Sequence, residues 1–321
     1  MTDYRWAILG PGTIAAEFAD AVHAAGQHIY GVGSRNLERA REFAAAHHIE
    51  KAYGSYDDLL ADPSIDIIYL STPHSSHYKY LLHALEAGKH VLCEKAIVLS
   101  SRQLAPVLQL AKTKKRVVCE AMTLFHMPLY TKLRQLIKSG TLGTIKLVNV
   151  TFGSLKPDDP SSRFFNPDLA GGALLDIGTY ALSFARFFLS SQPQTVLTTV
   201  KRFETGVDEQ SGIILQNDAN ELGTITLAMR AKLPKRGIVA GERAFVIVDN
   251  FPRADRATLT YPDGQSEIIT AGNSGQALMY EFNDMNSAVL NGEEGTMALT
   301  SDVIALMTTV RDQWGIRYPF E

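Results

Sequence analysis

Residues 4–26 read YRWAILGPGTIAAEFADAVHAAG, in which an apolar run, a glycine turn and an amphipathic stretch follow one another. The run at 4–10 predicts a buried β-strand, and the stretch after the turn has the helical spacing of apolar residues. Between them GPGTIA, at 10–15, matches G-x-G-x-x-A. In that pattern the first two glycines allow a tight turn and a close approach of a pyrophosphate, Ala15 permits close helix packing, and the helix N-terminus faces the phosphates. This order predicts a dinucleotide site, with a merely tight turn as the alternative; the residues placed at the cofactor are Gly10, Gly12, Thr13 and Ile14.

Strands and helices continue to alternate after this first pair. Four further apolar runs, at 28–34, 65–71, 90–94 and 116–120, are separated by segments with helical periodicity. Short strands that alternate with helices are typical of a parallel sheet. Residues 1–121 are therefore predicted to form an α/β Rossmann domain with a doubly wound parallel sheet. Pro106 lies inside one helical segment, where it predicts either a kink or the first turn of the helix.

The order of elements changes after residue 121. Two helical segments flank a strand and a loop rich in proline and aspartate, and a succession of strand-like segments then extends from about 195 to 270. Runs of strands without helices between them indicate an antiparallel sheet. Two helical segments, at 276–292 and 296–314, close the chain. We therefore expect a second domain, 122–321, of the α+β class with a large, mainly antiparallel open sheet.

The composition argues against several classes of protein. The 31 basic and 34 acidic residues give a net charge of −3, and the dense basic cluster KTKKR at 112–116 is typical of a solvated helix end, so no nucleic-acid partner is expected. No apolar run approaches the roughly 18 residues that span a bilayer, so no membrane partner is expected either. Cys93 and Cys119 lie in apolar runs and are expected to be buried thiols. Such thiols suit a reducing compartment, which predicts a cytoplasmic protein.

The end of the second predicted strand bears on the choice of dinucleotide. NAD binders commonly place an acid about 20 residues beyond the glycines, where it holds the ribose hydroxyls. Here the strand ends GVGSRNLER, with Ser34 and Arg35 at the position and Arg39 one turn into the next helix. Because a guanidinium binds a phosphate bidentately, this stretch favours NADP(H) over NAD(H). The alternative is that Ser34 caps the helix and the arginine is simply solvated.

Polar residues also stand at the ends of the next two strands, where an open parallel sheet binds its ligands. The two segments are STPHSSH at 71–77 and EKA at 94–96. The spacing H-x-x-H could suggest a metal, but no third ligand accompanies it and no metal site is predicted. The histidines are expected to cap a helix or to contact the cofactor, and Lys95 is expected to leave the sheet at the nicotinamide end. The residues predicted to face the cofactor are Ser71, Thr72, Pro73, His74, His77, Glu94 and Lys95.

One helical segment, GALLDIGTYALSFARFFLS, combines an apolar character with a polar stripe. Asp176, Thr179, Tyr180 and Ser183 fall at i, i+3, i+4 and i+7, and Arg186 continues the row. A polar stripe on a buried helix needs partners. A cavity that holds a hydroxylated substrate would supply them, and an internal hydrogen-bond network joining the two domains is the alternative.

Four motifs in this order, GPGTIA, STPHSSH, EKA and GGALLDIGTY, resemble the glucose-fructose oxidoreductase, inositol dehydrogenase and rhizopine-catabolism family (Gfo/Idh/MocA) over essentially the whole chain. The resemblance implies a Rossmann domain followed by an α/β domain whose open sheet often mediates dimerisation, and hence a homodimer or higher homo-oligomer. Glu94 and Lys95 match the family's E-K-P. Asp176 and Gly178 match the start of its D-x-G-x-H-x-x-D.

The departures from the family pattern narrow the assignment. Tyr180 stands where inositol dehydrogenase-like members have a catalytic His, and Ser183 replaces the second Asp. With RFFNPDLAGG and with EAM at 120–122, these residues are similar to the branch of dimeric dihydrodiol dehydrogenase and NADP-dependent D-xylose dehydrogenase. In that branch a Tyr and the motif Lys serve the chemistry. Its NADP preference agrees with the independent interpretation of Ser34 and Arg35.

The resemblance implies reversible hydride transfer between NADP(H) and a hydroxyl-bearing carbon of a sugar or cyclic diol. Tyr180 is expected to be the acid-base, because a nearby ammonium such as that of Lys95 lowers the pKa of a phenol toward neutrality. Asp176 is expected to anchor the substrate or Lys95, and Arg163 to reach the cofactor or substrate. Two other functions stay open, a nicotinamide-dependent glycosidase and a non-enzymatic NADP sensor.

One residue of the E-K motif departs from the family in a further way. Members usually follow the Lys with a Pro, often in a cis bond, whereas this chain has Ala96. A cis bond before a residue other than proline costs about 3 kcal/mol. The sequence therefore leaves two alternatives, a trans Lys95–Ala96 peptide with a re-aimed lysine or a cis bond kept for function.

Overall fold

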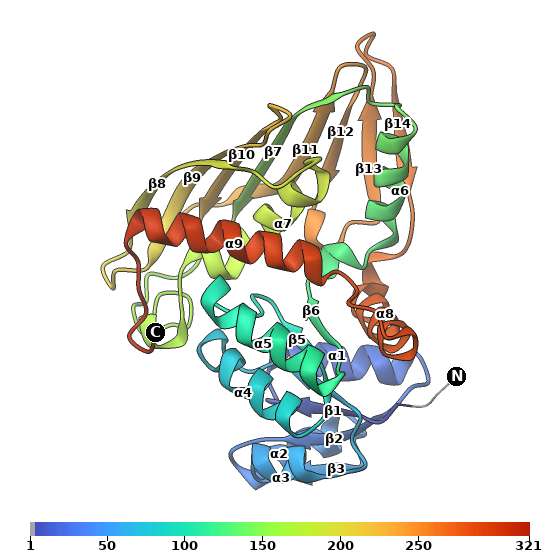
Figure 1. Ribbon diagram of the computed structural model, residues 1–321, viewed down its shortest axis with the longest axis vertical. Coiled ribbons are helices and arrows are strands. Elements are labelled where there is room, and N and C mark those ends of the chain that lie inside the picture. Colours follow the sequence, from blue (N-terminus) through green and yellow to red (C-terminus); the bar gives the residue numbers. More distant parts are fainter. Residues whose placement is uncertain (1–3) are drawn as a thin grey trace. The chain divides into compact units, whose positions relative to one another are not determined.

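A computed structural model describes residues 4–321, which form two compact units. The first unit contains the chain up to Met122 together with Gly275–Ala298, and the second contains Thr123–Ser274 and Leu299–Glu321. Figure 1 shows the elements of both units in the order of the chain.

The first unit is built on a parallel six-stranded sheet in the order β3-β2-β1-β4-β5-β6, the strand order of a Rossmann fold. Its strands are β1 Trp6–Leu9, β2 Ile29–Gly33, β3 Lys51–Tyr53, β4 Ile67–Leu70, β5 His90–Glu94 and β6 Val118–Ala121. Its helices are α1 Thr13–Ala24, α2 Leu37–Ala46, α3 Tyr56–Ala61, α4 His74–Glu86, α5 Ser101–Lys114 and α8 Ala277–Asn291. The sequence predicted five of these strands but not β3. That strand has only three residues, none of them buried, so the sequence contains no apolar run at this place.

Helix α8 differs from its predicted place. The sequence assigned all of 122–321 to the second domain, yet residues 275–298 pack with the first unit. Phe282 of α8 stacks on Trp6 of β1 with ring centroids 4.7 Å apart, and the Trp6 indole donates to Asn286 Oδ1 at 3.0 Å. A segment near the C-terminus thus completes the hydrophobic core of the first unit. No local sequence pattern predicts this arrangement.

Two expectations about the first unit have clear outcomes. Cys93 and Cys119 are both free and buried, as predicted. Pro106 lies inside α5, five residues after its first residue Ser101, so it does not mark the first turn of that helix.

The second unit is built on an eight-stranded sheet in the order β14-β13-β12-β11-β7-β10-β9-β8. The strands are β7 Ile145–Gly153, β8 Thr195–Arg202, β9 Asp208–Gln216, β10 Leu222–Ala228, β11 Leu233–Gly241, β12 Phe245–Asp249, β13 Arg256–Thr260 and β14 Ser266–Thr270. Six of the seven pairings are antiparallel, and only β7 and β10 pair in parallel. The predicted fold class, a Rossmann domain plus a domain with a large and mainly antiparallel sheet, is confirmed.

Helices of the second unit pack against its sheet. They are α6 Pro128–Lys138, α7 Thr179–Phe188 and α9 Met297–Trp314, most of which belongs to this unit. Helix α7 contacts β7, β10 and β11, and its Phe184 closes on Gly237 of β11 so tightly that a Cβ at that glycine would lie 2.2 Å from the ring. The end of α9 reaches β8, where the Trp314 indole donates to Thr198 Oγ1 at 2.9 Å (Figure 1).

Candidate active site

The glycine turn has the shape that a dinucleotide requires. Gly10 has φ +104°, and a Cβ there would lie 2.9 Å from the Thr72 side chain, so both backbone and space demand glycine. Gly12 precedes α1 without a side-chain cap, and the nearest atom to a Cβ placed on it is Ser71 O at 4.0 Å. The first amides of α1, from Thr13 onward, have no capping side chain, which suits a pyrophosphate. The Ser71 hydroxyl donates to Gly10 O at 2.9 Å and joins the two strand ends.

The end of β2 carries cations and no acid. Arg35 is exposed, and Arg39 donates from Nη2 to Pro11 O at 2.9 Å, which ties α2 to the glycine turn. Burial raises the pKa of Tyr56, and the positive charges of Arg35 and Arg39 oppose that rise. The alternative prediction, that Ser34 caps the helix, is wrong. Asn36 is the N-cap of α2, and its side chain accepts from Arg39 N at 3.1 Å.

Tyr56 itself was not predicted from the sequence. It begins α3 directly after the short strand β3, and its ring meets that of Tyr80 edge-on with centroids 4.8 Å apart. In the sequence, Tyr56 is recognisable only as an aromatic residue that follows the helix-capping Ser55. That pattern can be interpreted only when the position of β3 is known.

The E-K turn is held by buried acids. Glu94 accepts from the Tyr69 hydroxyl at 2.6 Å and from Lys95 N at 3.2 Å. Glu120, whose role was not predicted, is buried and accepts from Ile97 N at 3.0 Å. The Lys95–Ala96 peptide bond is cis, which answers the question that the sequence left open. The side chain of Lys95 is partly exposed at the carboxyl end of β5, whereas Glu94 is turned to the backbone.

The two histidines bind the same turn rather than a metal. His74 Nε2 lies 2.9 Å from Lys95 O. The ring of His77 is fully buried, with Nδ1 2.9 Å from Ala96 O and Nε2 2.7 Å from Thr72 O, and burial holds its pKa below the usual range. His77 thus joins the ends of β4 and β5 and presents no surface to a ligand. Among residues 4–321, no group of three or more His, Cys, Asp or Glu side chains is arranged to hold a metal ion.

The second unit contributes Asp176 and Tyr180. Asp176 lies in a π-helical turn, Leu174–Gly178, that runs directly into α7, and its side chain is 13% exposed. Tyr180, the second residue of α7, is partly exposed and its ring lies 6.3 Å from that of Phe152. Arg163 approaches Asp176 with Nη2 3.9 Å from Oδ1, and its guanidinium lies 4.3 Å from the Phe164 ring. The structure therefore gathers these three predicted residues at one place in this unit.

The predicted polar stripe is divided. Thr179 and Ser183 are fully buried, and within the described part of the chain neither hydroxyl has a hydrogen-bond partner. Asp176 and Tyr180 are the partly exposed pair. The prediction of one continuous stripe assumed a uniform α-helix, whereas Asp176 lies in a π-helical turn with wider spacing and the other three residues lie in the α-helix that follows. Such turns occur frequently at functional sites.

A buried acid holds the N-terminal end of this helical segment. Asp208, the first residue of β9, is 1% exposed and accepts from Leu174 N at 2.6 Å. A Cβ on Gly172, which has φ +121°, would lie 2.2 Å from Asp208 Oδ1, so this turn is fitted around the carboxyl group. The Tyr318 hydroxyl donates to Gly171 O at 2.7 Å, so a residue near the C-terminus also holds this turn in place. Sequence patterns gave no sign of Asp208, since it reads as one polar residue at the start of a strand.

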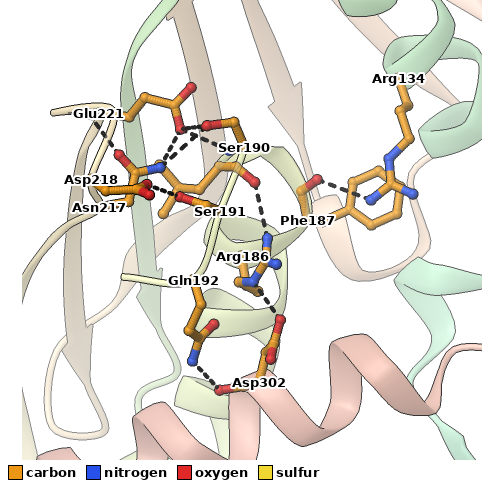
Figure 2. Close-up of polar contacts among 11 residues, drawn as sticks. Arg134, Arg186, Phe187, Ser190, Ser191, Gln192, Asn217, Asp218, Glu221 and Asp302 are labelled. Carbon is orange, nitrogen blue, oxygen red and sulfur yellow. Dashed lines mark hydrogen bonds and ion pairs between the residues drawn. The ribbon is translucent and has the colours of Figure 1, made fainter. Parts of the chain in front are cut away.

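Cations hold the opposite end of α7 (Figure 2). Arg186 donates to Asp302 Oδ2 at 2.8 Å and to Leu189 O at 3.0 Å. Arg134 of α6 donates to Phe187 O at 3.3 Å. Positive charge at a helix C-terminus matches the helix dipole. Arg186 was predicted to continue the stripe toward a substrate, and the structure instead places it in an internal network within the second unit.

A second cluster in Figure 2 joins the residues after the C-terminal end of α7 to the segment between β9 and β10. Glu221 is buried and accepts from Ser190 N at 2.7 Å and from Asn217 Nδ2 at 2.6 Å. The helix that carries Asp176 and Tyr180 is thus fixed at both ends by charged groups from other elements.

Fold and side chains together define an oxidoreductase with a nucleotide-binding Rossmann unit. Residues 4–122 match the family described as "Oxidoreductase family, NAD-binding Rossmann fold", and residues 130–247 match the "GFO/IDH/MocA C-terminal domain". The chain belongs to the GFO/IDH/MocA oxidoreductase family. The resemblance found in the motifs is confirmed.

Characterised relatives agree with an enzyme. The chain is 31% identical to trans-1,2-dihydrobenzene-1,2-diol dehydrogenase of Xenopus laevis over 98% of this chain and 99% of that protein. It is 32% identical to the Homo sapiens enzyme of that name over 75% of this chain and 73% of the relative. It is therefore a dehydrogenase or reductase that uses a nicotinamide cofactor.

Solved structures share the fold. The 3-ketoreductase KijD10 from Actinomadura kijaniata, in complex with NADP and TDP-benzene, has a TM-score of 0.86 at 22% identity, covering 97% of this chain and 98% of its own. Levoglucosan dehydrogenase, in complex with NADH and levoglucosan, has a TM-score of 0.88 at 18% identity, covering 98% of this chain and 99% of its own. Over residues 4–321, no helix is long and apolar enough to cross a membrane.

Proposed function

We propose that this enzyme transfers hydride between NADP(H) and a hydroxyl-bearing carbon of a sugar or cyclic diol. The observation that carries the proposal is Tyr180, presented partly exposed beside Asp176 on a helix that is anchored at both ends. Fixed placement of an acid-base group is what proton transfer in a transition state requires. The names of the relatives in Xenopus laevis and Homo sapiens, which are dehydrogenases of a cyclic diol, support the substrate class.

The first unit supplies the cofactor site. Gly10, Gly12 and the amides that open α1 hold the pyrophosphate, and those amides have no capping side chain. Arg35 and Arg39, with Tyr56 beside them, favour a 2′-phosphate over a bare ribose. The preference for NADP over NAD rests on these charges, because the solved relatives include complexes with NADP and with NADH.

The bound nicotinamide supplies a carbon that accepts or donates the hydride. When hydride leaves the substrate carbon, Tyr180 takes the hydroxyl proton, and in reduction it returns that proton. A phenol with its ordinary pKa of about 10 is mismatched to neutral pH, and a nearby ammonium favours the phenolate; we assign that role to Lys95, the lysine of the family motif. Asp176 orients the substrate hydroxyl, and Arg163, 3.9 Å from it, orients Asp176 or the substrate.

Replacement of Tyr180 and Lys95 tests this assignment. We expect Tyr180→Phe and Lys95→Met each to lower kcat by about two to four orders of magnitude, because each removes a group that acts in proton transfer. Binding of NADPH, followed by fluorescence titration, should stay measurable in Tyr180→Phe. A screen of aldoses, cyclic diols and dicarbonyl compounds for NADPH turnover supplies the substrate.

The same experiment separates the other functions. Near-normal turnover in either variant rejects the assignment of Tyr180 and Lys95. Cleavage of a glycosidic bond without net change in NADPH would indicate a nicotinamide-dependent glycosidase. NADPH binding without any catalysed reaction would indicate a sensor.

A homodimer through the sheet of the second unit is part of the proposal. Leu197 and Ile214 are paired across β8 and β9 and are 59% and 43% exposed, an apolar pair on the outer face of the sheet. We place the protein in the cytoplasm, because the buried free thiols of Cys93 and Cys119 suit a reducing compartment.

A further inference from the structure

The turn that carries Lys95 is largely buried, and nearby side chains bind its backbone groups. On the amide side, Lys95 N donates to Glu94 Oε2 at 3.2 Å and Ile97 N donates to Glu120 Oε1 at 3.0 Å. Ala96 and Ile97 are fully buried, so their polar backbone groups depend on partners within the protein rather than on water. The carbonyl groups of the turn need donors in the same way.

The two histidines of the H-x-x-H spacing lie at these carbonyl groups. His74 and His77 are three residues apart at the start of α4, which places them on one face of that helix. His74 Nε2 lies 2.9 Å from Lys95 O, and His77 Nδ1 lies 2.9 Å from Ala96 O. A pair of residues with the spacing of metal ligands thus contacts two consecutive carbonyl groups of the E-K turn.

His77 also contacts the end of the neighbouring strand. Its Nε2 lies 2.7 Å from Thr72 O, just beyond β4, and the ring is fully buried. Thr72 in turn borders the glycine turn, because a Cβ on Gly10 would lie 2.9 Å from the Thr72 side chain. A rigid ring with a carbonyl oxygen at each nitrogen fixes the distance between the end of β4 and the turn that carries Lys95.

The charge state of this ring suits its place beside a lysine. Both contacts are to carbonyl oxygens, so a neutral ring donates to one of them at a time and an imidazolium donates to both. Burial lowers the pKa of His77, the neighbouring carbonyl oxygens oppose that shift, and the charge of Lys95 lowers the pKa further. The ring is therefore neutral at pH 7 and adds no positive charge next to the Lys95 ammonium.

We propose that His77 is a positioning residue for Lys95. The buried ring holds the turn at a fixed distance from the end of β4, so that the lysine side chain leaves the sheet in the direction that the chemistry requires. His74 supports the same turn through Lys95 O. The inference rests on the proposed function, which it extends by a residue that acts through Lys95. Because a misplacement of about 1 Å can cost about 100-fold in rate, we expect the effect in kcat.

Replacement of His77 by Gln tests the inference, because a flexible amide does not keep the spacing of a rigid ring. With a sugar or cyclic diol that the enzyme turns over, kcat should fall about 10- to 100-fold, and the dissociation constant of NADPH should change by less than about threefold. An equal loss of NADPH affinity overturns the inference, because His77 would then act through Thr72 on the cofactor site.

The matched control is His90→Gln at the other end of the same strand. His90 is the first residue of β5, and its Nδ1 accepts from Val117 N at 2.9 Å, so this histidine also binds backbone. The control should keep kcat to within about twofold of the wild type, because it lies far along β5 from Lys95. A fall in kcat as large as that of His77→Gln overturns the inference, because a general loosening of the strand would then explain both.

A double-mutant cycle separates positioning from other losses. If His77 acts through Lys95, His77→Gln should lower the residual kcat of Lys95→Met by less than about twofold. If the two replacements instead multiply their separate effects, His77 acts independently of Lys95 and the inference fails.

Hydrogen exchange tests the same contact without turnover. In the presence of NADPH, amides within residues 94–99 of His77→Gln should exchange about tenfold or more faster than in the wild type, measured by mass spectrometry of peptides that cover this segment. His90→Gln should leave this segment at the wild-type rate. Equal acceleration in both variants, or none in either, overturns the inference.

The two proposals fail in different ways. If Tyr180→Phe and Lys95→Met abolish turnover but His77→Gln keeps the wild-type kcat, the proposed function stands and the role of His77 does not. If exchange within residues 94–99 depends on His77 but no compound supports hydride transfer, His77 holds the turn and the proposed function does not stand.

Discussion

At the scale of single residues, charge at the end of β2 is the feature that bears on the choice of cofactor. Arg39 is fixed by its hydrogen bond to Pro11 O at 2.9 Å, whereas Arg35 is exposed and can turn toward a ligand. Both guanidiniums oppose the rise that burial causes in the pKa of the Tyr56 phenol. A phosphate on the ribose would meet a charge-assisted donor here, and an unphosphorylated ribose would not.

Removal of Arg35 tests this feature. Arg35→Ala should weaken NADP by about 10- to 100-fold, the range expected for a hydrogen bond to a charged group, and NAD far less. Dissociation constants from fluorescence titration of both dinucleotides measure the effect. Arg41→Ala is a matched control on α2, because Arg41 pairs with Glu38 on the surface. Equal losses for NADP and NAD would show that Arg35 does not contact the 2′-phosphate.

At the scale of elements, the segment from Leu174 to Phe188 is held by acids at its start and cations at its end. The Asp208 carboxyl group accepts from Leu174 N at 2.6 Å. Arg186 and Arg134 donate to the carbonyl oxygens of Leu189 and Phe187. Near a helix N-terminus a carboxylate is normally favoured. Burial nevertheless outweighs the amide donors and Arg311 and raises the pKa of Asp208 to about 6.

The pKa of Asp208 predicts a pH dependence of stability. Because the folded state binds this proton more tightly than the unfolded chain, whose Asp pKa is about 4, the contribution is complete below about pH 4 and is lost as pH rises through 6. Asn cannot ionise. The free energy of unfolding of the wild type should therefore fall relative to that of Asp208→Asn, by on the order of 3 kcal/mol, between about pH 4 and pH 7.5.

Urea unfolding of both proteins at several pH values measures this difference. Arg311 of α9 acts on the pKa of Asp208, and Asp208 in turn raises the pKa of the Tyr318 phenol, so the same series should be run at two salt concentrations. Asp263→Asn, at an exposed turn, controls for the loss of one negative charge. A difference that stays constant with pH would contradict the assignment.

At the scale of the whole molecule, the outer face of the eight-stranded sheet carries one row of paired residues, five of them Leu or Ile and three of them Thr or Asn. Directly paired residues of a sheet point to the same face, so the register identifies the row from edge to edge. None of its eight members is buried within the chain. They are Leu197, Ile214, Thr224, Asn149, Ile238, Ile247, Thr258 and Ile268. The proposed homodimer would form through this face.

Charges in this row should prevent association. Wild type is expected to have a mass near twice the 35.2 kDa of one chain, measured by light scattering after gel filtration. Leu197→Asp/Ile214→Asp should give the mass of one chain, because two carboxylates would have to be buried without partners. Leu290→Asp, at a leucine of α8 that is 64% exposed, is the matched control and should leave the mass unchanged. Unaltered mass in the double variant would exclude this face as the interface.

The sequence predicted much of what local physical chemistry determines. GPGTIA between an apolar run and an amphipathic stretch requires a Rossmann turn, and Gly10 has the positive φ that only glycine adopts easily. Successive strands after residue 195 predicted the second sheet. Asp176, Tyr180 and Arg163 were named from their motif and loop, and the structure places them together. Their catalytic roles stay predictions.

Only the tertiary structure decided what depends on distant contacts. Residues 275–298 join the first core because Phe282 stacks on Trp6, a pairing that no window of sequence contains. Packing of α7 buried Thr179 and Ser183 and left Tyr180 partly exposed, and Asp208 holds the start of that segment because β9 places it beside Leu174 N. Local periodicity determines elements, because neighbours along the chain set backbone preference. Packing between elements determines which polar groups face a ligand and which are buried.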